Sequence, residues 1–582
     1  MPAGSGSFRT RIILLGALFM GCAALLSYRL YVFQWVERDQ YREKATRNHQ
    51  RTISVLPQRG SIFDANGNPL AVTVQLDAVS ITGKDLAKDP LKGNQSVQKL
   101  AGMLGIQPQE VQALVEPERE DPVMVRDQLP AALADQIRYA IDDGTLSGVS
   151  IEPRPVRQYP EGSIAPQLLG WVGRDREGLS GLEFQFDAEL RGEPGIIETE
   201  ADTTDKEIIL ARRIVQAPRE GTDLVLTLDR YVQRMLEREL AEAVRANKAS
   251  GGLIMVMEPA TGAILGMASL PTFTVSDPMV IQEGEETLHK AVGVTNQYEP
   301  GSVMKLVTMA SALELGLVTP NTTVNDDGIV TFRNAPGQPV TTIKNWDLRA
   351  NGTISMTEVL VRSSNVGTYF VAQKLGEEQL YNFLHLFGFG ERTGVQLPGE
   401  VPGTIRTPDD PDWTVIDLAT NAYGQGIAVT PLQMLNAVAA IGNDGVLMRP
   451  SIIKQVDGPD GMRRIEPQEI RRVISADTAR TLREMMVTVI NQPGLQAHRI
   501  AGLSVAGKTG TADFPTNLGY TTGKTFASIV ALLPAERPKL AVLIRLDAPE
   551  AIFGGTVAAP VLKRVGSELA AYYRIPMNAN GP

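Results

Sequence analysis

The sequence predicts an α+β protein with one membrane-spanning helix near its N-terminus, and three observations support this prediction. A long apolar run lies at residues 12–36 of the 582-residue chain. Strand-like segments occur at both ends of the C-terminal region, at residues 223–269 and 525–546, with helical patterns between them. This order is typical of a sheet that joins early and late strands and packs against helices. Contents of 43% apolar and 21% charged residues are those of an ordinary folded protein.

The apolar run has the length and the flanking charges of a membrane anchor. A helix over Ile12–Val36 would extend about 37 Å at 1.5 Å per residue, which spans a hydrocarbon core of about 30 Å. Arg9 and Arg11 precede it without any acidic residue, so the positive-inside rule places residues 1–11 in the cytoplasm and the rest outside the plasma membrane. A cleaved signal peptide fits less well because no Ala-x-Ala site follows the run. A lipoprotein would use Cys22, but apolar sequence continues after that cysteine.

Residues 37–218 are expected to form several separate pieces. The charged stretch at 37–51 has a helical pattern and is expected to continue the anchor helix outward. Asp64-Ala-Asn66-Gly67 is typical of a hairpin turn between two strands. Polar, helix-rich sequence over residues 85–143 predicts a separate lobe. Residues 183–190 are expected to form one amphipathic helix.

A domain boundary is expected near Pro218–Thr222, where a strand pattern begins. After it we predict strands at 223–229, 252–258, 263–269, 525–533 and 540–546, with helices at 231–247 and 557–573. The expected parts are a cytoplasmic tail at 1–11, a transmembrane helix at 12–36, a pedestal domain at 37–218, a catalytic domain at 219–575 and a tail at 576–582.

Three short motifs stand in one order within the C-terminal region. They are Ser302-Val-Met-Lys305, Ser363-Ser-Asn365 and Lys508-Thr-Gly-Thr511. Ser-x-x-Lys also occurs at Ser96 and Ser451, so that motif alone is not specific. Only the Ser302 copy follows a Pro-Gly pair, precedes a long helical pattern and has the other two motifs after it. We therefore predict that Ser302 is functional and that Ser96 and Ser451 are surface residues.

The first two motifs supply the groups that serine acyl transfer needs. A serine hydroxyl is a weak nucleophile until a base takes its proton, and Lys305 lies on the same helical face as Ser302. Lys305 acts as a base only when neutral, and burial near another cation such as Lys508 would lower its pKa. Ser363 offers a hydroxyl that passes a proton to a leaving amine, and Asn365 an amide that holds both Lys305 and a substrate carbonyl.

The third motif lies on a predicted strand. Lys508 and Thr509 suit a substrate carboxylate. Gly510 lets another segment approach the strand closely. The backbone N–H of Thr511, together with that of Ser302, is suited to an oxyanion hole.

Composition argues against other classes of function. The formal net charge of −10 argues against nucleic acid as a partner. The single cysteine cannot form an intramolecular disulfide, and four scattered histidines argue against a zinc site or a Ser–His–Asp triad.

The three motifs and several flanking segments resemble class B penicillin-binding proteins over nearly the whole chain. The flanking segments are Arg59-Gly-Ser-Ile-Phe-Asp64, Gly181-Leu-Glu183, Tyr298-Glu-Pro-Gly-Ser302 and Thr430-Pro-Leu-Gln433. Within this family, Ser363-Ser-Asn-Val-Gly367 and Gly554-Gly-Thr-Val-Ala-Ala-Pro560 resemble the cell-division and sporulation branch. The chain departs from the family at Ala65, where arginine is common, and at Met304.

The resemblance implies an elongated pedestal ahead of a serine β-lactamase-like transpeptidase domain, with an antiparallel sheet flanked by helices. It implies D,D-transpeptidation of peptidoglycan stem peptides through Ser302, covalent inhibition by β-lactams, and no metal or organic cofactor. It also implies a SEDS-type glycosyltransferase and divisome membrane proteins as partners. Alternatives are an elongation-type transpeptidase, a D,D-carboxypeptidase or β-lactamase on the same fold, a β-lactam sensor, and a scaffold that activates a glycosyltransferase without catalysis.

Overall fold

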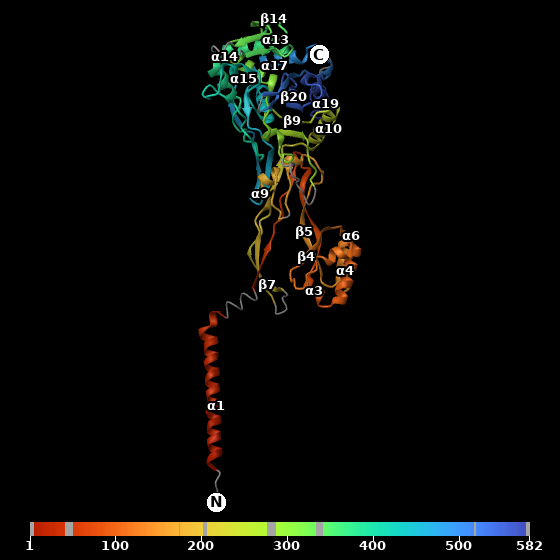
Figure 1. The fold of residues 1–582 in the computed structure, drawn as a ribbon, viewed down its shortest axis with the longest axis vertical. Coiled ribbons are helices and arrows are strands. Elements are labelled where there is room, and N and C mark those ends of the chain that lie inside the picture. The colour runs from red at the N-terminus through yellow and green to blue at the C-terminus, as the bar shows by residue number, and fades with distance from the viewer. Residues whose placement is uncertain are drawn as a thin grey trace. The chain divides into compact units, whose positions relative to one another are not determined.

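A computed structural model describes residues 5–40, 50–173, 175–201, 207–275, 287–332, 341–516 and 519–577. The chain divides into two compact units. Residues 1–58 and 192–220 form the first, and residues 59–191 and 221–582 form the second. Figure 1 shows the elements along the chain.

The first unit contains the apolar helix and a small sheet. Helix α1 (Ser5–Tyr31) begins earlier than predicted and continues as the π-helical turn η1 (Val32–Val36). Among the described residues it is the one helix long and apolar enough to cross a membrane. The sheet pairs β6 (Gly195–Ala201) antiparallel with β1 (Gln50–Val55) and β7 (Glu207–Gln216). The helix predicted over residues 37–51 is therefore wrong at its end, where residues 50 and 51 pair in a strand, and residues 41–49 lie outside the described ranges.

The second unit begins with the predicted hairpin. Strand β2 (Ile62–Phe63) pairs antiparallel with β3 (Pro69–Ile81), and Gly67 in the turn has φ of 82°, a left-handed conformation that glycine adopts without strain. The hairpin prediction is confirmed. In addition, β2 pairs parallel with β8 (Asp223–Leu226), so the hairpin joins the sheet of the C-terminal region.

A helical lobe packs beside β3, β4 (Val123–Leu129) and β5 (Val149–Gln158). Its helices are α3 (Gly83–Ala87), α4 (Pro90–Leu104), α5 (Pro108–Gln112) and α6 (Ala131–Asp142). These elements share an apolar core of their own, as the sequence predicted for a separate lobe. Ser96 lies in this lobe with 1% of its surface exposed. Its hydroxyl accepts from the Ser147 N–H at 2.9 Å, so the prediction of a surface residue is wrong because helix α4 turns Ser96 inward.

Charged residues are buried where the hairpin meets three short helices, α7 (Pro166–Leu169), α8 (Gly181–Gln185) and α9 (Asp187–Arg191). Arg59 contacts Glu183 and Asp187 at 2.7 Å each, and Arg157 contacts Glu183 at 2.7 Å. We call these four residues the pedestal ion cluster. The single helix predicted over residues 183–190 is wrong, because the chain breaks at Phe186, which has non-helical backbone angles.

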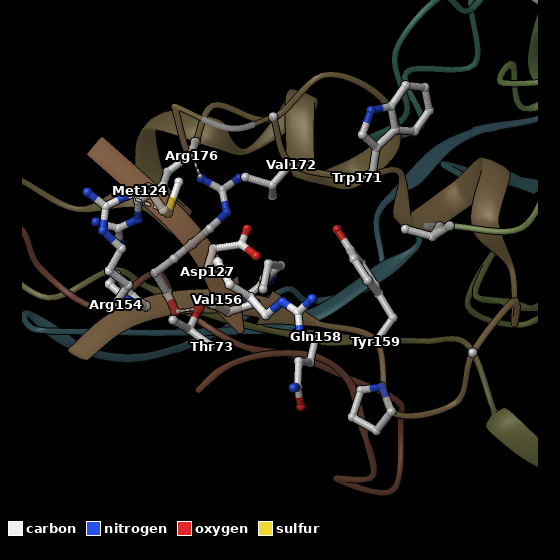
Figure 2. Close-up of a pocket in the computed structure, with 18 of the residues that line it drawn as sticks. Thr73, Met124, Asp127, Arg154, Val156, Gln158, Tyr159, Trp171, Val172 and Arg176 are labelled. Atoms are coloured by element: carbon white, nitrogen blue, oxygen red, sulfur yellow. Dashed lines mark hydrogen bonds between the residues drawn. The ribbon is translucent and has the colours of Figure 1, made fainter. Parts of the chain in front are cut away.

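A hollow of about 640 Å³ lies beside this cluster (Figure 2). Arg154 and Met124 lie on one side of it, and Tyr159 and Trp171 on the other. Arg157 also lines the hollow while its side chain is held against Glu183.

An antiparallel five-stranded sheet forms the centre of the C-terminal region, in the order β10-β9-β21-β20-β19. The strands are β9 (Gly251–Met257), β10 (Ile264–Leu270), β19 (Ala506–Thr516), β20 (Gly519–Leu533) and β21 (Leu540–Asp547). The predicted joining of early and late strands is confirmed by β9 pairing with β21. Every residue of β9 is buried, so this strand lies inside the core.

Helices cover both faces of this sheet (Figure 1). On one face pack α10 (Arg230–Ala246) and α19 (Ala559–Tyr572), and on the other α12 (Lys305–Glu314), α16 (Pro431–Gly442) and α17 (Ala476–Ile490). The final helix is interrupted at Ala558, between α18 (Gly554–Val557) and α19, rather than continuous over 557–573.

The remaining elements surround these layers. They are α11 (Val292–Thr295), η2 (Gly301–Val303), β11 (Thr323–Asp326), β12 (Ile329–Phe332), β13 (Thr341–Lys344), β14 (Gly352–Ser355), α13 (Met356–Val361), α14 (Asn365–Leu386), α15 (Val415–Ala422), β15 (Val446–Met448), β16 (Ile453–Gly458), β17 (Gly461–Arg464), β18 (Glu469–Arg472) and η3 (Gln496–His498). Ser451 lies just before β16 and is half-buried, with its hydroxyl bonded to the Ile453 carbonyl at 2.9 Å, so it is not the surface residue that we predicted.

Candidate active site

The segment that carries Ser302 is held between the sheet and a glycine-rich loop. Ser302 lies in the short turn η2, directly before α12. The Gly301 N–H donates to the Gly424 carbonyl at 2.9 Å. A Cβ at Gly424 would lie 2.1 Å from the Gly301 carbonyl oxygen, so only glycine allows this contact. The glycine-rich loop at residues 423–426, directly after α15, therefore borders the Ser302 segment.

Lys305 is buried behind Ser302, with 1% of its surface exposed. Its ammonium donates to the Ser363 carbonyl at 2.6 Å, to the Asn365 Oδ1 at 2.7 Å and to the Ser363 Oγ at 3.3 Å. Burial, followed by the charge of Lys508, holds the pKa of Lys305 well below its ordinary value. Both causes are those expected from the sequence, and they favour the neutral amine that a base requires.

The Ser363 hydroxyl is the centre of the hydrogen-bond network. It donates to the Ser302 Oγ at 2.8 Å and accepts from the Lys508 Nζ at 3.1 Å. Among the described residues, the Ser302 hydroxyl has one hydrogen bond, which it accepts from Ser363. Because Lys305 also bonds to Ser363, Lys305 is linked to Ser302 through the Ser363 hydroxyl. Ser363 has φ of 55°, which is uncommon for a residue with a side chain. Such strain persists only where the surroundings hold it in place.

Two residues that the sequence analysis missed hold this strained turn. The Asp326 carboxylate accepts from the Ser364 Oγ at 2.6 Å and from the Asn345 Nδ2 at 2.8 Å. The Asn345 Oδ1 in turn accepts from the Asn365 N–H at 3.0 Å. Hydrogen bonds from four residues hold the pKa of Asp326 below its ordinary value although burial opposes this. The sequence around Asp326 signals only a turn, so no motif could have identified the pair.

Lys508 lies on β19, opposite Ser363, with 1% of its surface exposed. Burial lowers its pKa to about 7. Its ammonium also donates to the Thr509 carbonyl at 3.0 Å. Gly510 allows the Ser302 segment to lie against this strand, since a Cβ there would approach Val303 to 2.9 Å and the Pro300 carbonyl oxygen to 3.0 Å.

A cleft of about 770 Å³ opens over this network. Of the residues that the sequence singled out, Ser302, Ser363, Asn365, Thr509 and Thr511 line the cleft. The ammonium groups of Lys305 and Lys508 lie behind its wall and reach it through Ser363. All eight predicted site residues therefore gather within one cleft or directly behind it.

The arrangement has the parts of a serine acyl-transfer site. A hydroxyl borders open space, a second hydroxyl bonds to it, and two buried amines bond to the second hydroxyl. Thr511 lines the cleft at the strand edge beside Gly301 and Ser302. Within the described residues, no group of three or more His, Cys, Asp or Glu side chains could hold a metal ion.

Family comparisons agree with this chemistry. The family described as the penicillin-binding protein transpeptidase domain matches residues 252–566, and the penicillin-binding protein dimerisation domain matches residues 54–226. Stage V sporulation protein D of Bacillus subtilis is 30% identical over 550 residues, which cover 93% of this chain and 82% of that protein. Peptidoglycan D,D-transpeptidase FtsI of Buchnera aphidicola is 29% identical over 562 residues, which cover 95% of this chain and 94% of that protein.

Solved structures share the fold. Penicillin-binding protein 3 of Mycobacterium tuberculosis, complexed with aztreonam, is 27% identical with a TM-score of 0.68 over 91% of this chain and 98% of that one. Penicillin-binding protein 2X of Streptococcus thermophilus is 24% identical with a TM-score of 0.74, over 90% of this chain and 80% of that one. This likeness concerns the fold alone.

Proposed function

The chain belongs to the class B penicillin-binding proteins, and from this premise we propose that it cross-links peptidoglycan through an acyl-enzyme on Ser302. It is a serine-type D,D-transpeptidase of cell-wall synthesis. The roles of individual residues are our proposal. The observation that carries them is the Ser363 hydroxyl, which bonds to the Ser302 hydroxyl and to both buried amines.

In the first half-reaction, the Ser302 Oγ attacks the carbonyl carbon between the two D-alanines of a donor stem peptide. Its proton passes by way of Ser363 to the neutral amine of Lys305. The N–H groups of Ser302 and Thr511 stabilise the tetrahedral oxyanion. Lys508 and Thr509 hold the terminal carboxylate of the donor.

The tetrahedral intermediate then collapses. The C–N bond breaks, and the leaving D-alanine amine takes its proton from Lys305 through Ser363. Asn365 keeps Lys305 in place during both transfers, since its Oδ1 accepts from the ammonium at 2.7 Å. Ser302 is left as an ester of the shortened stem peptide.

In the second half-reaction, a primary amine of a neighbouring strand attacks this ester. The same relay takes the proton of that amine and returns one to Ser302. A new amide cross-link forms and the free serine is restored. β-Lactams acylate Ser302 by the first of these routes, because their strained amide replaces the scissile bond while their carboxylate lies against Lys508 and Thr509.

The intact mass of the detergent-solubilised chain after incubation with a penicillin tests the site assignment. We expect a persistent single adduct in the wild type and none in Ser302→Ala. An adduct that survives in Ser302→Ala would disprove the assignment of the nucleophile. Rapid drug turnover without accumulation would indicate a β-lactamase, and no adduct in the wild type would favour a scaffold.

Location, partners and domain limits complete the proposal. We infer a single-pass anchor at residues 12–36 after a cytoplasmic tail at 1–11, a pedestal at 37–218, and an extracytoplasmic transpeptidase domain at 219–575 followed by a tail. A septal role with divisome proteins and a SEDS-type glycosyltransferase is supported by the likeness to proteins named FtsI and stage V sporulation protein D. Depletion of the chain would then give filaments with unfinished septa, whereas rounded cells would indicate the elongation role.

A further inference from the structure

An acidic side chain faces the cleft beyond the third motif. Asp513 lies on β19, two residues after Thr511, and lines the same cleft as Ser302. Successive side chains of a strand point to opposite faces. Thr509, Thr511 and Asp513 all line the cleft, whereas Gly510 and Ala512 do not. The Asp513 side chain therefore continues the row of groups that meets the substrate.

This carboxylate has no partner in the part of the chain that the structure describes. Asp513 is half-buried, and no hydrogen bond or ion pair within that part involves its side chain. Burial alone raises its pKa above the ordinary value. Asp513 is also the one acidic residue among the described residues that line the cleft, whose basic residues are Lys344, Arg362 and His498. A half-buried, unpaired anion in a binding cleft favours a cationic ligand group.

The direction in which the donor stem peptide runs along β19 decides which of its residues lies beside Asp513. Strand β19 stands at the end of the five-stranded order, so an extended peptide can pair along its free edge. The donor carboxylate lies at Lys508 and Thr509, and the reacting carbonyl between Ser302 and Thr511. The peptide therefore runs antiparallel to β19, and the residue before the two D-alanines lies about one strand step, roughly 3.4 Å, further toward Asp513.

We propose that Asp513 selects donor stem peptides in which the residue before the D-Ala–D-Ala pair carries a free side-chain ammonium. Asp513 acts as a specificity residue and takes no part in bond making, since it lies about two strand steps, roughly 7 Å, beyond Thr511 toward the donor's acyl portion. This inference rests on the proposed function, because the donor's direction follows from the roles given to Ser302 and Lys508.

The test compares two synthetic donors in the full-length protein. One is a peptide ending in Lys-D-Ala-D-Ala with a free lysine ammonium, and the other is the same peptide with that amine acetylated. D-Alanine release is measured before any acceptor is added, so that only the donor site is read. We expect the wild type to prefer the free-ammonium donor about tenfold, the size of a partly buried charge-assisted contact. Asp513→Asn should abolish the preference, and Asp513→Glu should restore part of it.

The ratio of the two donor rates is the readout, because it cancels any general loss of activity. Asp409→Asn is the matched control, since it removes an exposed carboxylate that does not line the cleft. A preference that persists in Asp513→Asn, or that is absent from the wild type, overturns the inference. So does an effect of Asp513→Asn confined to the acceptor step. A wild type that penicillin acylates but that shows no preference refutes this inference alone, whereas absence of acylation refutes the proposed function as well.

Discussion

Two groups of buried charges in the second unit differ in how they are balanced. In the pedestal ion cluster, Arg59 and Arg157 face Glu183 and Asp187 at 2.7 Å. In the cleft, Lys305 and Lys508 bond to hydroxyl, amide and carbonyl oxygens, and among the described residues no carboxylate bonds to either ammonium. The pKa values of both lysines are lowered, mainly by burial.

The difference separates a structural use of buried charge from a chemical one. A buried ion whose partner is close stays charged and holds segments distant in sequence together. A buried ammonium without a counter-ion gives up its proton more readily and becomes a base near neutral pH. We expect substitutions in the pedestal cluster to affect folding, and substitutions in the cleft to affect acylation.

The largest expected effect is that of Lys305→Met. Loss of the base should slow penicillin acylation about 10²–10⁴-fold. The free energy of unfolding should change by no more than about 2 kcal/mol, because the methionine removes a buried amine while leaving two acceptors unpaired. Stopped-flow acylation and urea unfolding measure the two quantities. Severe destabilisation with little kinetic effect would break the comparison.

The opposite pattern is expected for Glu183→Gln in the pedestal cluster. Both arginines would lose their shared carboxylate while buried, at a cost of about 3–5 kcal/mol in stability. Acylation by the folded fraction should remain at the wild-type rate. Urea unfolding and active-site titration with a fluorescent penicillin check this. Glu193→Gln, at an exposed ion pair, is the matched control and should change stability by less than about 1 kcal/mol.

The comparison also predicts a bell-shaped pH profile for the acylation rate, which changes about tenfold per pH unit on the acid side and on the alkaline side. Acylation should rise with pH as Lys305 loses its proton, and fall above about pH 7 as Lys508 loses the charge that holds the carboxylate. Lys508→Arg should remove the alkaline fall, since a guanidinium stays protonated. Acylation rates from pH 5 to 9 measure this, and a flat wild-type profile would contradict it.

The shifted pKa of Lys508 also makes the free energy of unfolding depend on pH in a definite direction. The folded pKa of Lys508 lies below its unfolded value of about 10.4, so the unfolded state binds more protons between about pH 7 and 10. The contribution of Lys508 to stability is therefore least favourable below pH 7 and improves as pH rises through that window. Lys508→Met should flatten this part of the curve relative to the wild type.

The smallest expected effect concerns the other two Ser-x-x-Lys copies. Ser96→Ala should cost about 1 kcal/mol, because the N–H of the half-buried Ser147 loses its acceptor. Ser451→Ala should cost no more than that, since Ser451 is half-buried. Neither should alter penicillin acylation. Thermal unfolding and the mass assay test this, and slower acylation in either variant would mean that a copy outside the cleft takes part.

The sequence predicted the three motifs of the active site, their order along the chain and several of the strands and helices around them. Ser302, Ser363 and Lys508 were identifiable because each motif combines reactive groups at a fixed spacing. Hairpin β2–β3, strands β9 and β21 and helix α10 were predictable because their patterns are local. Asp326 and Asn345 were not, because they hold the Ser363 turn from strands and loops whose own sequence signals only turns.

The sequence by itself determined which chemical groups are present and in what order, since these are properties of residue type and spacing. The tertiary structure decided which of them are buried and what they face. It turned Ser96 inward, broke the helix at Phe186, and placed Ser363 between Ser302 and the two lysines. Desolvation depends on every segment packed around a group, and those segments lie up to hundreds of residues apart, so no local pattern encodes it.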